Sequence, residues 1–180
     1  NEITARVNAL PDNCFTFFSM FPGGFTPNFG GNITDTSLTA GTKGEFKSGF
    51  AQGVFYDFSA SVGRNESTFN IINTVNASLG PDTPTDFEAG KYIQLEKNFT
   101  ADFVKYVNAG LYNDVAVAGG LQWTEETFEI VAGEVASWEI GPYVSQLTNG
   151  SNGFPGFQPD DAGVNTRRNY AAYVDVQAEM

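Results

Sequence analysis

The stretch VFYDFSASVG, from Val54 to Gly63, decides the fold class of this chain. Its even-numbered residues are apolar, and most of the odd-numbered residues between them are polar or small. Side chains on a β-strand alternate between the two faces of the sheet, so this spacing predicts a strand with one apolar face and one wet face. The same alternation recurs in the stretches 115–123 and 170–179.

Because the alternation recurs along the sequence, we expect an all-β chain with about six strands. The predicted strands are Glu2 to Asn8, Thr34 to Phe46, Gln52 to Asn73, Lys91 to Tyr106, Leu111 to Ile130 and Arg167 to Glu179.

The connections between these strands alternate in length. Three are long, at Ala9 to Ile33, Thr74 to Gly90 and Val131 to Thr166, and two are tight, at Lys47 to Ala51 and Val107 to Gly110. In an antiparallel up-and-down meander every second connection lies at the same end, so the long loops share one end and the tight turns the other. Long strands with this asymmetry are typical of a segment of a transmembrane β-barrel. The alternative is a soluble β-sandwich, in which alternation separates the core from solvent.

Charged residues follow the apolar tracks on the long-loop side. Each track is about as long as the ~9 to 11 residues that a tilted strand needs to cross a bilayer. We therefore expect a polar rim where the strands leave the membrane, formed by Arg64 and Glu66, Glu125 and Glu126, and Arg167 and Arg168. Glu125 and Glu126 are neighbours on a strand and point to opposite faces, which argues against paired acid-base catalysis.

Composition excludes several classes of function. The formal net charge is −12 and the chain has no His. Nucleic acid would be repelled, and the usual general base and zinc ligand are both missing. We expect no enzyme activity, no cofactor and no metal site. The acidic pair Asp160 and Asp161 lacks the spacing of a calcium loop and is interpreted as solvated loop charge.

The chain has no apolar run near 18 residues and therefore no predicted transmembrane helix. Cys14 is the single Cys, and no His is present to activate its thiol. No signal peptide begins at Asn1, and both ends fall within predicted strands, so we expect the chain to be part of a longer one.

Five motifs carry a resemblance to a known family. They are FPGGFTP at 21–27, NTVNASLGPDTP at 73–84, ETFEIVAGE at 126–134, GSNGFPGF at 150–157 and NYAAYVD at 169–175. Together, and in this order, they resemble the barrel portion of TonB-dependent outer-membrane receptors.

The resemblance implies a Gram-negative outer-membrane transporter for a large, scarce solute: an iron chelate, cobalamin or an oligosaccharide. It also implies a plugged 22-stranded barrel, outer-membrane lipid as a partner, and contact with the TonB complex through parts of the receptor that this sequence lacks. The sequence has no recognisable plug domain and resembles about a quarter of such a receptor.

An open sheet leaves two unpaired edges that lipid cannot satisfy. The alternative function is therefore an extracellular, self-assembling β-structural protein, fibre-like or oligomeric, that associates through these edges.

Aromatic residues of the long loops are the candidate ligand-binding residues, because a rigid sheet would hold them and prolines stiffen the backbone between them. They are Phe21, Phe25, Trp138, Tyr143, Phe154 and Phe157. The alternative, which we favour, is that these rings pack the first and last loops against each other.

Five Asn-x-Ser/Thr triplets begin at Asn32, Asn65, Asn76, Asn98 and Asn149. They would indicate glycans in a secreted eukaryotic protein, but chance accounts for most of them, and Asn98 lies in the middle of a predicted strand.

Overall fold

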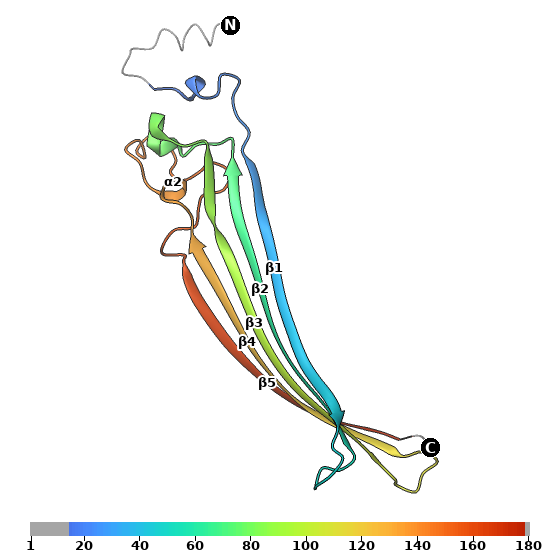
Figure 1. Ribbon diagram of the computed structural model, residues 1–180. Helices are drawn as coiled ribbons and strands as arrows, with labels where there is room; N and C mark the ends of the chain where they lie inside the picture. The colour runs from blue at the N-terminus through green and yellow to red at the C-terminus, as the bar shows by residue number, and fades with distance from the viewer. Residues whose placement is uncertain (1–14, 179–180) are drawn as a thin grey trace. The chain divides into compact units, whose positions relative to one another are not determined.

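The structure is a computed structural model, and it describes residues 15–178. Its strands are β1 (Asn28–Glu45), β2 (Val54–Ile72), β3 (Asp86–Val107), β4 (Val115–Ala132) and β5 (Gly163–Gln177). They form one five-stranded antiparallel sheet in the order β1-β2-β3-β4-β5, which does not close (Figure 1). The predicted up-and-down meander is confirmed. The predicted strand Glu2 to Asn8 lies outside the described residues.

Three strands begin earlier than predicted. β1 starts at Asn28 instead of Thr34, β3 at Asp86 instead of Lys91, and β5 at Gly163 instead of Arg167. The glycines before Thr34 were expected to form a loop, but a Cβ at Gly31 would lie 2.7 Å from the backbone oxygen of Thr68. Glycine here allows β1 to approach β2 closely, so it belongs to the strand.

The chain divides into two compact units. Unit 1 contains the described residues up to Thr34, Glu66–Ile93 and Glu129–Gly163, and unit 2 contains Asp35–Asn65, Gln94–Phe128 and the described residues from Val164 onward. The two long connections between described strands, after β2 and after β4, fall in unit 1, and the two short ones, after β1 and after β3, fall in unit 2. The predicted alternation of long and short connections is confirmed for these four, whereas the predicted connection Ala9 to Ile33 lies partly outside the described residues. The turn predicted at Val107 to Gly110 extends to Asp114, because β4 begins at Val115 instead of Leu111.

Unit 1 contains a small core and three short helical turns. The turns are η1 (Phe17–Ser19), η2 (Ala77–Asp82) and α2 (Val135–Trp138). Its buried hydrophobic side chains are Ile71, Val75, Phe87 and Ala89. Sequence periodicity did not predict these turns, because each is too short to show a helical repeat.

A buried polar network joins two loops of unit 1. The Asn76 side-chain amide donates to the backbone oxygens of Ala136 and Glu139 at 2.9 and 3.0 Å, and its Oδ1 accepts from Ser78 Oγ at 2.8 Å. Ser78 Oγ also accepts from the Gly141 amide at 2.9 Å. In the described part of the chain no buried side-chain nitrogen or oxygen lacks a partner, so this network fixes both loops at little desolvation cost.

An aromatic cluster packs the last loop of unit 1 onto its strands. Phe154 contacts Phe29 and Phe69 with ring centroids 4.6 and 6.1 Å apart, and Phe157 stacks on Tyr92 at 5.0 Å. The cluster therefore covers β1, β2 and β3 with the loop that follows α2.

Unit 2 is a sheet without a covering layer. Among its described residues, Ala101 is the only hydrophobic residue that is buried. Every residue of β5 is exposed, and so is nearly all of β1. These two strands form the edges of the sheet, and among the described residues each has a strand neighbour on one side only.

Candidate functional site

The contacts between strands fix the two faces of unit 2. The rings of Phe58 and Phe103 meet with centroids 5.6 Å apart, whereas the hydroxyls of Ser59 and Thr100 lie 2.6 Å apart. Neighbouring residues on a strand point to opposite faces, so these two pairs lie on opposite sides of the sheet. We call the side of Phe58 the apolar face and the side of Ser59 the polar face.

The apolar face exposes many large hydrophobic side chains. Leu121 is 61% exposed, Tyr170 77% and Val174 79%. The other exposed members of this face are Leu38, Val62, Phe99, Val117 and Val176. Single exposed hydrophobic residues are common on soluble proteins, whereas a sheet face that exposes this many is unusual.

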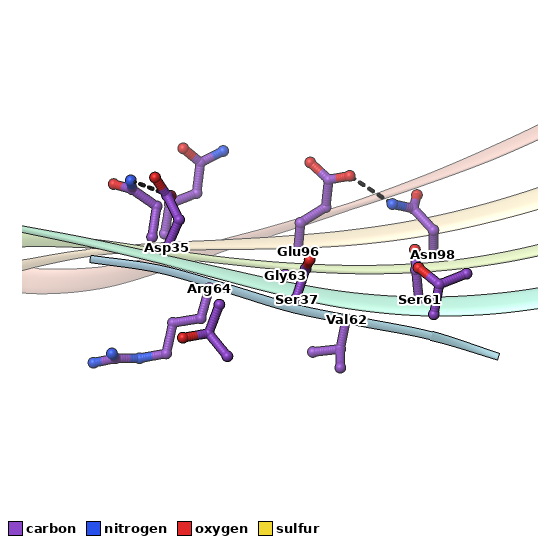
Figure 2. A pocket seen from close by; sticks show the side chains of 12 residues that line it. Asp35, Ser37, Ser61, Val62, Gly63, Arg64, Glu96 and Asn98 are labelled. Carbon is purple, nitrogen blue, oxygen red and sulfur yellow. Dashed lines mark hydrogen bonds between the residues drawn. The ribbon is translucent and has the colours of Figure 1, made fainter. Parts of the chain in front are cut away.

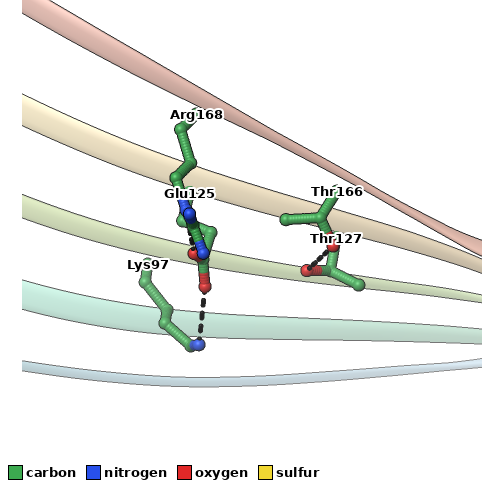
Figure 3. Close-up of polar contacts among 5 residues, drawn as sticks. All are labelled: Lys97, Glu125, Thr127, Thr166 and Arg168. Carbon is green, nitrogen blue, oxygen red and sulfur yellow. Dashed lines mark hydrogen bonds and ion pairs between the residues drawn. The ribbon is translucent and has the colours of Figure 1, made fainter.

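An ionic row crosses three strands of the apolar face. Figure 3 shows Glu125 of β4 between Lys97 of β3 and Arg168 of β5. Lys97 Nζ lies 2.9 Å from Glu125 Oε1, and Arg168 Nε lies 2.7 Å from Glu125 Oε2. Hydrogen bonds from Lys97 and then from Arg168 lower the pKa of Glu125 below its ordinary value, so the carboxylate stays charged near neutral pH.

An aromatic row lies beside the ionic row. The aromatic row consists of Phe99 of β3, Trp123 of β4 and Tyr170 of β5. On each strand the aromatic residue lies two positions from the charged residue of the ionic row, in the direction of the tight turns. The three aromatic residues line an apolar groove of about 400 Å³ together with Leu121 and Ala172. Aromatic side chains next to charged ones are typical of the membrane interface of a β-barrel.

Glu126 confirms that the two neighbouring carboxylates point to opposite faces. It pairs with Arg167, whereas Glu125 pairs with Lys97 and Arg168. The hydrogen bond from Arg167 lowers the pKa of Glu126. Of the predicted rim residues, Glu126 and Arg167 form an ion pair on the polar face, and Glu125 and Arg168 form an ion triad with Lys97 on the apolar face.

A polar groove of about 460 Å³ lies on the polar face. Asn65 Nδ2 donates a hydrogen bond to Asp35 Oδ1 at 2.7 Å. Asn98 Nδ2 donates to Glu96 Oε1 at 2.5 Å, and Asn98 Oδ1 accepts from Thr124 Oγ1 at 2.6 Å. Figure 2 shows Arg64 and Val62 directed to the opposite side from Asp35, Glu96 and Asn98. The groove offers carboxylates, amides and hydroxyls, with the serines and threonines Ser37, Thr39 and Ser61 among its lining.

Lys97 and Phe99 are not among the functional residues that the sequence predicts, and of the groove residues only Arg64, Asn65 and Asn98 are singled out, for the rim and as glycosylation triplets. The alternation is present in the sequence, because Lys97, Phe99, Ala101 and Phe103 alternate with Glu96, Asn98, Thr100 and Asp102 along β3. The charged Lys97 interrupts the apolar set, which makes this strand less conspicuous than β2.

All six candidate ligand-binding residues lie in unit 1, but the structure divides them into separate groups. Phe21 and Phe25 contact each other at 4.8 Å, and Phe154 and Phe157 belong to the aromatic cluster. Phe154 does meet the predicted first loop, because its ring partner Phe29 falls within Ala9 to Ile33, although the structure places Phe29 in β1. The other ring partners of Phe154 and Phe157 on the strands are Phe69 and Tyr92. The two loops do approach each other where Gly153 meets Pro27.

The two remaining candidates have structural partners within unit 1. Trp138 Nε1 donates to the backbone oxygen of Gly133 at 3.0 Å. The ring of Tyr143 packs over Gly80, where a Cβ would overlap it. Tyr143 keeps 38% of its surface exposed. Contact of any of these residues with a ligand stays a prediction.

Three of the glycosylation triplets, those at Asn65, Asn76 and Asn98, have their side-chain amides engaged in hydrogen bonds. Asn76 is 0% exposed, and the Asn98 side-chain amide is hydrogen-bonded to Glu96. Both are poor acceptor sites in the folded chain, whereas Asn32 and Asn149 are exposed.

Among the described residues, no cluster of three or more acidic or Cys side chains is arranged to hold a metal ion. Asp161 Oδ2 instead accepts from the Gln158 amide at 3.1 Å within its turn. In the same part of the chain, every helix is too short or too polar to span a bilayer. Comparisons of the chain with protein-family models, curated proteins and solved structures found no match.

Proposed function

We propose that this chain is a segment of a transmembrane β-barrel in the outer membrane of a Gram-negative bacterium. In this proposal the apolar face of unit 2 contacts lipid and the polar face lines the interior. The observation that carries the proposal is the order of side chains along the apolar face: an ionic row and an aromatic row across β3, β4 and β5, and then aliphatic residues on β4 and β5 toward the tight turns.

Lipid explains this order better than a second protein layer does. The nine residues from Val115 to Trp123 have the length that a tilted strand needs to cross the hydrocarbon region. The aromatic row then lies at the headgroups and the Glu125 ion triad lies in water. In a sandwich core, large side chains such as Val174 would require a matching sheet, and the described residues contribute only one sheet.

The direction of the strands constrains how such a barrel closes. Five antiparallel strands leave β1 and β5 running the same way, so direct closure would create a parallel seam. An all-antiparallel barrel needs an odd number of additional strands. A 22-stranded barrel satisfies this requirement, as does any barrel with an even number of strands.

We further propose that the barrel belongs to a TonB-dependent receptor that takes up an iron chelate, cobalamin or an oligosaccharide. The five motifs in family order support this proposal. The chain alone transports nothing, and any contact with the TonB complex would use other parts of the receptor.

The two Trp residues provide the test, because one lies on the apolar face and the other in a loop of unit 1. The chain is refolded into phosphatidylcholine vesicles as Trp138→Phe, which leaves Trp123, and as Trp123→Phe, which leaves Trp138. Fluorescence quenching is measured with lipids brominated at different acyl depths. We expect quenching of Trp123 that is strongest for shallow bromines, and little quenching of Trp138.

Equal quenching of the two Trp residues, or none for either in a folded β-rich sample, would contradict a lipid-facing surface. To test the receptor assignment separately, the complete gene would be sequenced. A reading frame that encodes no further antiparallel strands would refute it even if the apolar face binds lipid.

The second candidate function is a self-assembling β-structural protein outside the cell, favoured by the exposed edges β1 and β5. Sizing the chain without detergent separates the candidates. Detergent-dependent solubility favours the barrel segment and an ordered β-rich polymer favours assembly. A stable soluble monomer would defeat both.

A further inference from the structure

We propose that two copies of this chain pair through β5, antiparallel and in one register, with Arg167 of each copy opposite Asp175 of the other. The inference rests on the second candidate function, and it specifies which edge associates and how.

Topology restricts the ways in which two open sheets can join. For the apolar faces to stay on the same side, the second copy must be either translated or rotated by half a turn in the plane of the sheet. Translation brings β5 next to β1 in parallel, because the two edges run the same way. Rotation brings like edges together in antiparallel fashion, which is the slightly more stable pairing and gives a self-complementary two-fold contact.

Of the two edges, β5 is better suited to pairing. Its stretch YAAYVDV, from Tyr170 to Val176, has high β-propensity, a single charge, no Pro and no Gly. Its apolar face exposes Tyr170, Val174 and Val176, by 77%, 79% and 62%. By contrast, β1 contains four glycines and places mostly Thr, Asn and Gly on that face, so it offers less apolar area to bury.

Charge selects the register. Residues opposite each other in an antiparallel pair share a face, so Arg167 can lie only opposite an odd-numbered residue. Asp175 is the one acidic residue of β5, and pairing it with Arg167 of the second copy forms the same ion pair twice. Arg167 already binds Glu126, but its side chain is 74% exposed and a guanidinium has five donors, so it can serve both carboxylates.

This register places Ala171 opposite Ala171 of the second copy, and Tyr170 opposite Ala172. On the apolar face the large Tyr170 then lies opposite the small Ala172. Ala171 lies at the centre of the contact, and its replacement by Cys removes no interaction described above. Directly opposed Cβ atoms lie about 4.5 to 5.5 Å apart, close enough for a disulfide after small adjustments.

The experiment uses the full chain in a Cys14→Ser background, which has no other Cys. Ala171→Cys, Ala172→Cys and Thr39→Cys are oxidised mildly without detergent, and covalent dimer is measured on a non-reducing gel. We expect dimer from Ala171→Cys at a yield at least about fivefold above the other two. Adding Asp175→Arg, which places two cations opposite each other, should remove most of that yield while the circular dichroism spectrum stays β-rich.

Two results would overturn the proposal. Equal cross-linking at Ala171 and Thr39 would mean that the edges are not distinguished, and preferential cross-linking at Ala172 would mean a different register. A polymer that forms without cross-linking at Ala171 leaves self-assembly standing and refutes only the β5 contact. A soluble monomer refutes both.

Discussion

The hydroxyl of Tyr173 donates a hydrogen bond of 2.8 Å to Oδ1 of Asp102, a residue 71 positions earlier in the chain. Tyr173 lies on β5 and Asp102 on β3, so the bond passes over the intervening strand β4. It crosses at Gly120, where the absence of a side chain leaves room for the tyrosine ring. Three strands of the polar face are thereby connected through one side chain.

Gly120→Ala should destabilise unit 2 by about 1 to 3 kcal/mol, because the added methyl group would overlap both Asp102 Oδ1 and the Tyr173 ring. Gly119→Ala is the matched control, since its Cβ would lie at ordinary contact distances, 3.4 Å from the backbone oxygen of Tyr173 and 4.0 Å from the Val174 side chain. Urea unfolding of both variants in one detergent measures the difference. Similar urea denaturation midpoints for Gly120→Ala and Gly119→Ala would show that the Tyr173–Asp102 hydrogen bond does not require glycine at position 120.

Leu121→Arg should cost about 1 to 2 kcal/mol when the chain inserts into vesicles, because the cation would enter the hydrocarbon region one step below the aromatic row, between the interface and the midplane. Leu121 is 61% exposed on the apolar face, and its neighbour Gln122 points to the polar face. Gln122→Arg should therefore insert almost as well as the unmodified chain. The inserted fraction is read from protease protection, and equal losses for both variants would argue against a lipid face.

Stability should fall as the pH drops below the ordinary carboxylate pKa of 4.5, in part through Glu125. The folded pKa of Glu125 is depressed by Lys97 and Arg168, so its ion pairs contribute fully above 4.5 and are lost as the pH falls through the folded pKa. Glu125→Gln should flatten this part of the profile of denaturation midpoint against pH. Glu134→Gln, at an exposed loop residue, is the control and should leave the profile unchanged.

Asn76→Ala should loosen the loops of unit 1. It leaves the backbone oxygens of Ala136 and Glu139 without their partner, at about 1 to 3 kcal/mol for each buried group that stays unsatisfied. Hydrogen exchange of the amides of Ser78 and Gly141 should accelerate. Asn149→Ala is the control, because it removes an exposed side-chain amide from another Asn-x-Ser/Thr triplet, and it should leave both exchange rates unchanged. If exchange accelerated equally in Asn149→Ala, the hydrogen bonds of Asn76 would not be what holds the loops.

Strand alternation was sufficient to predict most of the sheet. The expected strand Gln52 to Asn73 corresponds to Val54–Ile72, because its period-2 pattern is regular from Val54 to Gly63. The first residues of β1 and β3 fall within the predicted connections Ala9 to Ile33 and Thr74 to Gly90, both of which contain glycines. In the structure Gly31 lies within a strand where the neighbouring backbone comes close, and Gly90 has φ 118° beside the ring of Phe157.

The charged rim was predicted by residue type but not by partner. The sequence indicated that Glu125 and Glu126 point to opposite faces, but the pairing of Glu125 with Lys97 depends on the register between β3 and β4. The loop network could not be predicted at all. Nothing local in the sequence marks Asn76 and Ser78 as partners of a loop 60 residues away, since Asn and Ser are common in exposed turns.

The hydrogen bond from Thr74 Oγ1 to the oxygen of Asn152 joins residues 78 positions apart, whereas Asn98 and Thr124 of neighbouring strands are only 26 apart. The entropy of loop closure rises with the length of chain enclosed, so contacts within a hairpin of unit 2 cost less closure entropy than contacts between the loops of unit 1. The hairpins of unit 2 are therefore expected to form first, and the loops of unit 1 last. Until the loops of unit 1 fold, the side chains of the aromatic cluster are expected to be exposed to solvent. We therefore expect misassembly to occur most easily before this last step of folding.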